Sequence, residues 1–159
     1  MKSCIPLFAV LLLAGALLLR PHSHKIPRVV HADTGCDATS LNGGYGFNLT
    51  GFFFDNFGNT NFFSDSGRLV GDGQGGLTGK QTASVNGGVA RADAITGSYT
   101  MNSDCTGSMT TNSASVGSLT LDFVLTNNGN EIQLIEADRG SDIAGSGKKQ
   151  IIPVPVSGT

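Results

Sequence analysis

The sequence predicts an all-β domain: a single antiparallel up-and-down meander of about eight strands that closes into a β-barrel. Between Asp33 and Lys149, apolar residues alternate with a period of two, the spacing that puts every second side chain of a strand on one face. Clusters rich in glycine and asparagine separate these apolar runs, which indicates short turns between neighbouring antiparallel strands. Glycines also stand inside the runs, where they permit the strong coiling that a small closed sheet requires.

The turn clusters divide the chain into eight expected strands. In order, these strands lie near residues 44–54, 60–70, 76–85, 89–101, 105–111, 117–126, 131–138 and 142–151. The clearest turn signals are Gly71–Gly76, Asn86–Gly88 and Asn127–Asn130, because asparagine and glycine reach the positive φ values of tight hairpins most easily. The Asp72–Gly75 stretch also carries oxygen ligands that could hold calcium, but a hairpin turn explains it better.

Alternation identifies the expected core face of four of these strands. The residues that share a face are Tyr45, Phe47, Leu49 and Phe53 in the first strand, Ile95, Tyr99 and Met101 in the fourth, Leu119, Leu121, Phe123 and Leu125 in the sixth, and Ile132 and Leu134 in the seventh. A closed barrel buries these faces and leaves no edge strand, so we favour it over the alternative, a two-sheet sandwich.

Residues 1–32 have the form of an export signal peptide. Lys2 supplies a positive start, Cys4–Leu19 is an apolar run, and Val30 and Ala32 stand at the −3 and −1 positions of a cleavage site. An uncleaved anchor is the alternative, although the run is shorter than the roughly 20 residues that span a bilayer. We therefore expect a signal peptide at 1–32, a barrel domain at 33–152 and a flexible tail at 153–159. The protein would be secreted, periplasmic or on the cell surface, with no membrane span after cleavage.

Cleavage after Ala32 would remove all three histidines and leave two of the three cysteines. A domain without histidine lacks the usual general base and the usual transition-metal ligand, so we expect no catalytic residue, no metal and no cofactor. Export leads to an oxidising compartment, where Cys36 and Cys105 should form one structural disulfide. A redox-active pair is the alternative, but there is no C-x-x-C spacing to support it.

The charge of the expected mature domain is strongly negative. Four of the ten basic residues lie in the leader and all twelve acidic residues lie beyond it, which leaves six bases against twelve acids and a net charge of −6. An acidic surface repels phosphate, which argues against nucleic acid and anionic membranes as partners.

Six residues are candidates for ligand binding: Phe52, Phe54, Phe62, Tyr99, Glu136 and Arg68. Adjacent phenylalanines at 52–54 and 62–63 must place some rings outside the barrel, as a partner surface or cavity rim, unless the loop containing Phe57 covers them. Glu136 shares parity with Ile132 and Leu134, so it should point inward, with Arg68 as a possible partner. The alternative is a solvated carboxylate at the barrel mouth.

Several segments resemble a group of uncharacterised secreted bacterial proteins common in acidobacteria. The resemblance is carried by Leu41–Phe47, Gly51-Phe52, Gly67–Leu69, Asp72–Gly79, Gly97–Thr100 and Asp104–Gly107. It implies a small β-barrel of the lipocalin or allene-oxide-cyclase-like kind and brings no known reaction.

Three classes of function remain open. The first is a binding module for a small apolar ligand or a cell-envelope component, and the second is a self-associating structural envelope protein. The third and weakest is an enzyme, either a cavity-type isomerase or a glycosidase that uses two of Asp122, Glu136 and Asp138. The sequence leaves the ligand and the oligomeric state unassigned.

Overall fold

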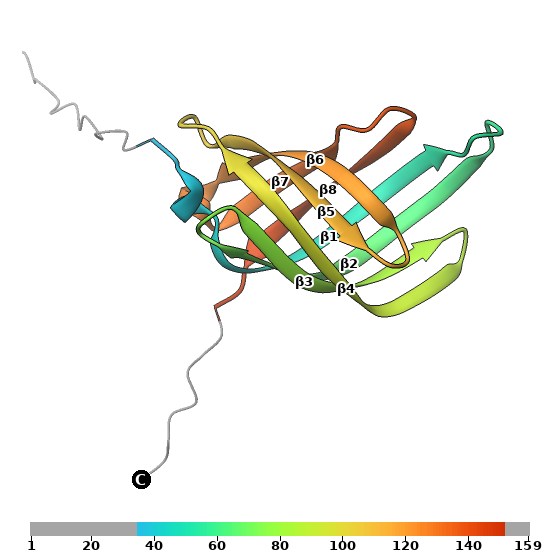
Figure 1. The fold of residues 1–159 in the computed structure, drawn as a ribbon, viewed down its shortest axis with the longest axis horizontal. Coiled ribbons are helices and arrows are strands. Elements are labelled where there is room, and N and C mark those ends of the chain that lie inside the picture. The colour runs from blue at the N-terminus through green and yellow to red at the C-terminus, as the bar shows by residue number, and fades with distance from the viewer. Residues whose placement is uncertain (1–34, 152–159) are drawn as a thin grey trace, which may run out of the picture. The chain divides into compact units, whose positions relative to one another are not determined.

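Eight antiparallel strands close into a barrel in which each strand pairs with its neighbours in the chain (Figure 1). The structure is a computed structural model and describes residues 35–151. Its elements are η1 (Ala38–Ser40), β1 (Asn42–Phe54), β2 (Thr60–Asp72), β3 (Gly76–Val85), β4 (Gly88–Met101), β5 (Thr106–Ser113), β6 (Gly117–Thr126), η2 (Asn127–Gly129), β7 (Glu131–Glu136) and β8 (Ser141–Lys149). Strand β8 pairs with β1 along its whole length. The predicted closed meander is therefore confirmed, and the sandwich alternative is wrong.

The bounds of the predicted strands lie within two residues of the observed ones, and the seventh and eighth strands both end two residues earlier than predicted. Strand β7 stops at Glu136, so Asp138 lies in the β7–β8 turn and not in a strand. There its Oδ2 atom accepts a hydrogen bond of 2.8 Å from the backbone N–H of Thr120. The predicted leader (1–32) and tail (153–159) lie outside the described residues.

Asparagine and glycine build the tight turns that their positions predict. In the β3–β4 turn Asn86 and Gly87 have φ values of 48° and 86°, which match the twist of a two-residue hairpin. In the β2–β3 turn, the Asp72 Oδ1 atom accepts two backbone hydrogen bonds, of 2.7 and 2.9 Å, from the same turn. That carboxylate thus serves the turn's own backbone, as a hairpin requires.

Inward-facing side chains fill the middle of the barrel. The buried apolar residues are Leu41, Tyr45, Phe47, Leu49, Phe63, Leu69, Leu77, Ala83, Ile95, Tyr99, Met109, Leu121, Phe123, Leu125, Ile132, Leu134 and Ile143. Interior glycines let neighbouring strands coil closely: a Cβ at Gly145 would collide with the carbonyl oxygen of Asn48 on β1. The core faces expected from alternation in β1, β4, β6 and β7 are those that the barrel buries.

One end of the barrel is covered by the segment that precedes β1, and we call it the closed end. Leu41, which follows η1, is 1% exposed. The Tyr99 hydroxyl donates to the carbonyl oxygens of Ala38 (2.7 Å) and Leu41 (3.2 Å), and the Tyr45 hydroxyl donates to that of Gly129 (2.6 Å). These buried hydroxyls tie the N-terminal segment and the β6–β7 turn to the barrel wall.

The predicted disulfide joins Cys36 to Cys105 at this closed end. The Cys36 N–H also donates to the carbonyl oxygen of Ser103, at 3.0 Å. The bridge therefore joins the start of the domain to the β4–β5 turn, which is consistent with a structural disulfide.

The other end carries the β1–β2, β3–β4, β5–β6 and β7–β8 turns, and we call it the open end. In Figure 1 it is the right-hand end, where the β1–β2 and β3–β4 hairpins reach furthest. Strand β4 pairs with β5 only over Thr96–Met101, so the first half of β4 extends beyond β5. Within residues 35–151, no helix has the length and apolar character needed to cross a membrane.

Candidate ligand-binding site

A cavity of about 410 Å³ occupies the open end of the barrel. Its apolar lining includes Phe53, Phe54, Phe63, Val116, Leu119 and Ile143. Its polar lining includes Ser118, Thr120, Glu136, Asp138, Arg139 and Ser141. A hollow of this size whose walls combine aromatic and aliphatic surface with polar groups suits a small organic molecule.

Strand alternation decides which phenylalanines line the cavity. Phe53 shares the inward face of β1 with Leu49, and Phe63 is 3% exposed on the inward face of β2. Phe52 and Phe62, which are opposite each other in the β1–β2 pair, project to the outer face. The sequence had placed Phe53 on the core face, but it gave no reason to assign that residue to a ligand.

Four phenylalanines, Phe52, Phe54, Phe57 and Phe62, form an outer aromatic patch on the β1–β2 hairpin. Phe57 is 91% exposed, Phe62 68% and Phe54 51%. The Phe52 and Phe54 rings meet edge to face, with centroids 5.6 Å apart. The loop that contains Phe57 therefore leaves these rings uncovered. Of the three phenylalanines predicted to bind a ligand, only Phe54 also lines the cavity.

Glu136 reaches the cavity from the last position of β7, where it is opposite Leu121 on β6. Its Oε2 atom is buried and has no hydrogen-bond partner. Burial raises the pKa of the Glu136 carboxyl, and the charge of the nearby Asp138 adds to this effect, while a hydrogen bond from Ser141 opposes it. Glu136 therefore faces inward, as expected from its alternation with Ile132 and Leu134.

Asp65 is a second inward carboxylate, and sequence reasoning missed it. It is 4% exposed on β2, one inward position deeper than Phe63, and neither carboxylate oxygen has a hydrogen-bond partner. Burial raises the pKa of Asp65 to about 6, and the charge of Asp93 also acts in this direction, against the backbone N–H of Ser66. An uncompensated acid this deeply buried is unusual in a protein interior.

Other polar groups near the open end are satisfied within the protein. The Gln81 side-chain amide is 7% exposed and donates to the Ser113 hydroxyl at 2.9 Å. Asp93 accepts hydrogen bonds from the hydroxyl and the N–H of Ser115, which lower the pKa of its carboxyl. Glu136 and Asp65 differ from these residues in that they retain unused acceptor capacity.

Tyr99 and Arg68, like Phe52 and Phe62, lie away from the cavity. The Tyr99 hydroxyl is occupied at the closed end by backbone carbonyls. Arg68 lies on the outer face of β2, over Gly44, and its Nε donates to the Gln150 side chain at 2.7 Å. Arg68 therefore does not partner Glu136.

The three acids that could serve a glycosidase do not converge. Asp122 faces outward on β6, where it is opposite Ser108 and Ile135, whereas Glu136 faces the barrel interior. Asp122 instead borders a shallow outer hollow of about 520 Å³ over β5, β6 and β7. None of the described residues that border this hollow has a buried, unpartnered polar side chain, so the open-end cavity is the stronger candidate site.

No family model and no curated protein matches the chain. Among solved structures, a de novo designed fluorescence-activating β-barrel is 14% identical, with a TM-score of 0.49 over 72% of this chain and 99% of its own. A redesigned β-barrel, mFAP1, solved bound to DFHBI, is 15% identical, with a TM-score of 0.48 over 71% of this chain and 98% of its own. These similarities concern architecture alone, so ligand chemistry has to be argued from this chain's own residues.

Proposed function

We propose that this protein is a secreted or cell-surface binding module that holds a small, largely apolar ligand in the open end of its β-barrel. The observation that carries the proposal is the cavity of about 410 Å³ at the end opposite the tethered N-terminal segment. Phe53, Phe63, Leu119 and Ile143 supply apolar surface to a ligand there. Burial of that surface would drive binding, and the cavity's few polar groups would orient the ligand.

Export is supported by the signal-peptide pattern at residues 1–32 and by the Cys36–Cys105 disulfide, because disulfides form and persist in oxidising compartments. The resemblance to secreted acidobacterial proteins of lipocalin-like architecture points the same way. Secretion and the lipocalin-like relationship are therefore included in the proposal.

A neutral dye tests the binding function. N-phenyl-1-naphthylamine should bind the wild-type protein saturably, with enhanced fluorescence. Leu119→Trp should abolish this binding because the larger side chain occupies the cavity, and Thr126→Trp should leave it unchanged because Thr126 is exposed at the opposite end of the same strand. A Leu119→Trp variant that still binds dye with wild-type affinity would contradict the proposed site.

Self-association through the outer aromatic patch is the second candidate function. The large exposed fractions of Phe57 and Phe62 favour it, because apolar rings gathered on one hairpin mark a contact surface. In that case the patch would hold two copies of the chain together, and replacement of Phe52 and Phe62, which do not line the cavity, would shift an oligomer to a monomer without an effect on the dye.

A further inference from the structure

We propose that the ligand of the open-end cavity is an organic cation: a protonated amine attached to an apolar body. This inference rests on the proposed binding function and assigns a charge to its ligand. Two inward carboxylates carry it: within residues 35–151 neither forms an ion pair, and both oxygens of Asp65 and the Oε2 atom of Glu136 are buried without a hydrogen-bond partner.

Glu136 presents the group that would contact the amine. Its Oε2 atom is buried in a residue that lines the cavity, and it has no hydrogen-bond partner. A carboxylate oxygen that has lost water without gaining a donor is costly, so a ligand that brings a donor recovers that cost. A charged N–H donor recovers the most, because charge-assisted hydrogen bonds are the strongest of those available to a carboxylate.

Asp65 provides an independent observation that points to the same ligand charge. It is 4% exposed, and both of its oxygens are unpartnered. It faces the interior one inward position deeper than Phe63, which lines the cavity. Its negative charge acts through a poorly screened interior, so it favours a positive group in the space above it and disfavours an anion there.

The basic residues of the described chain leave this negative charge uncompensated. Among residues 35–151 the ion pair is that of Lys148 with Glu131, on the outer face. Lys149 lies at the closed end, where its Nζ is 5.7 Å from the centroid of the Tyr45 ring. Arg139 belongs to the β7–β8 turn and lines the cavity, but within residues 35–151 no ion pair joins its guanidinium to Glu136 or Asp65.

The donor set fits an organic cation better than a metal ion. No group of three or more His, Cys, Asp or Glu side chains within residues 35–151 is arranged to hold a metal. The cavity that Glu136 lines also has apolar walls, with the aromatic rings of Phe53 and Phe63 among them. Such rings attract ammonium groups through their faces and pack against an apolar body.

Three probes that share a phenyl group and differ in charge test the inference: 2-phenylethylammonium, 2-phenylethanol and 3-phenylpropanoate. Each competes with N-phenyl-1-naphthylamine for the wild-type protein. We expect the ammonium ion to bind about tenfold more tightly than the alcohol and the carboxylate to bind most weakly. Glu136→Gln keeps the side-chain shape but removes the charge, so it should bring the ammonium ion to about the affinity of the alcohol and leave the alcohol unchanged.

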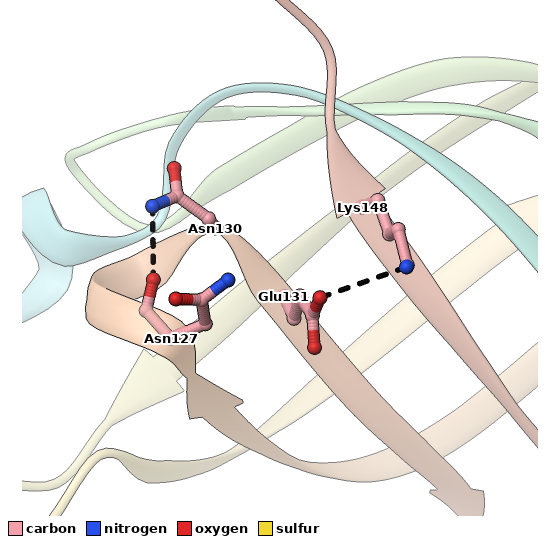
Figure 2. A network of polar contacts seen from close by, with 4 residues as sticks. All are labelled: Asn127, Asn130, Glu131 and Lys148. Atoms are coloured by element: carbon pink, nitrogen blue, oxygen red, sulfur yellow. Dashed lines mark hydrogen bonds and ion pairs between the residues drawn. The ribbon is translucent and has the colours of Figure 1, made fainter.

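Glu131→Gln is the matched control. Glu131 begins the same strand but faces outward, where its Oε1 atom lies 3.6 Å from the Nζ atom of Lys148 (Figure 2). Figure 2 also shows the Asn130 side-chain amide donating to the carbonyl oxygen of Asn127, in the adjacent turn at the closed end. The Glu131→Gln variant should keep the wild-type preference for the ammonium ion.

The outcomes separate this inference from the proposed function. Equal affinity of the ammonium ion and the alcohol for the wild-type protein, with the dye still bound, overturns the cationic ligand and leaves the binding function in place. A preference that survives in Glu136→Gln overturns the role of that carboxylate. Absence of binding by the dye and by all three probes overturns the proposed function and the inference together. If Glu136→Gln does not fold, the wild-type comparison decides alone.

Discussion

Asp65 is a buried carboxyl group whose raised pKa makes the stability of the folded protein depend on pH. Its pKa is raised to about 6 by burial, so the folded protein keeps this proton at pH values at which the unfolded chain has lost it. The contribution of Asp65 to the free energy of unfolding therefore falls as the pH rises from about 4 to above 6. We expect Asp65→Asn, which cannot ionise, to exceed the wild type in stability by about 3 kcal/mol at about pH 7.5 and to match it near pH 3.

Thermal unfolding of both proteins at the two pH values measures this difference. Asp122→Asn is the control, because Asp122 is exposed on the outer face of β6 and its replacement should change stability by less than about 0.5 kcal/mol at either pH. A difference between Asp65→Asn and the wild type that is the same at both pH values would show that folding does not raise the pKa of Asp65. The exposed acids Asp37, Asp55, Asp72, Asp93 and Asp104 have lowered pKa values and act in the opposite direction, but they are common to both proteins.

Asp65 also explains why part of the site could not be predicted. It shares parity with Phe63 and Leu69, but it stands between Ser64 and Ser66, so the local pattern does not reveal which face is buried. Glu136 was assignable because Ile132 and Leu134 mark the inward face of its strand. Parity gives a side chain's face only where apolar neighbours identify that face.

At the scale of elements, the β1–β2 hairpin separates core phenylalanines from surface ones within a few residues. Phe63→Ala should lower the free energy of unfolding by about 3–5 kcal/mol, because a ring that is 3% exposed leaves a cavity. Phe62→Ser, one residue away, should cost less than about 1 kcal/mol, because the Phe62 ring is 68% exposed. Urea unfolding of the two variants measures both values.

The same hairpin distinguishes the two candidate functions. The double variant Phe52→Ser, Phe62→Ser should bind N-phenyl-1-naphthylamine as the wild type does, because neither ring lines the open-end cavity. A shift from oligomer to monomer in sedimentation, with dye binding intact, would assign the outer aromatic patch to self-association. Loss of dye binding in this variant would place the dye on the outer surface and contradict the cavity.

The positions of the eight strands could be predicted from the sequence, but their exact ends and their place along the barrel could not. Turn residues located the eight strands because asparagine and glycine stand where the chain reverses. The end of β7 was missed because Asp138, although a residue type common in turns, continues the period-two alternation of the strand as far as Gly140. The sequence could not say which end of the barrel an inward residue occupies, so Tyr99 was grouped with Glu136 although the structure sets it at the closed end.

At the scale of the whole molecule, the asymmetry of the barrel depends on the disulfide. Cys36–Cys105 closes a long loop, with a sequence separation of 69 residues, and in the chain-entropy model such a bridge stabilises the fold by roughly 4 kcal/mol. It anchors the segment that covers the closed end, while the proposed binding site lies at the other end. We therefore expect reduction to lower the melting temperature and to leave dye affinity unchanged at temperatures where the reduced protein is still folded.

Thiol counting on the exported, denatured and unreduced protein checks the bridge and the leader together. A cleaved, bridged chain has no free thiol, and a bridged chain that retains its leader has one, from Cys4. Two free thiols would mean a cleaved chain without the bridge, which contradicts the structure. If reduction abolishes dye binding in a protein that remains folded, the two ends of the barrel are coupled, and the closed end is then part of the binding mechanism.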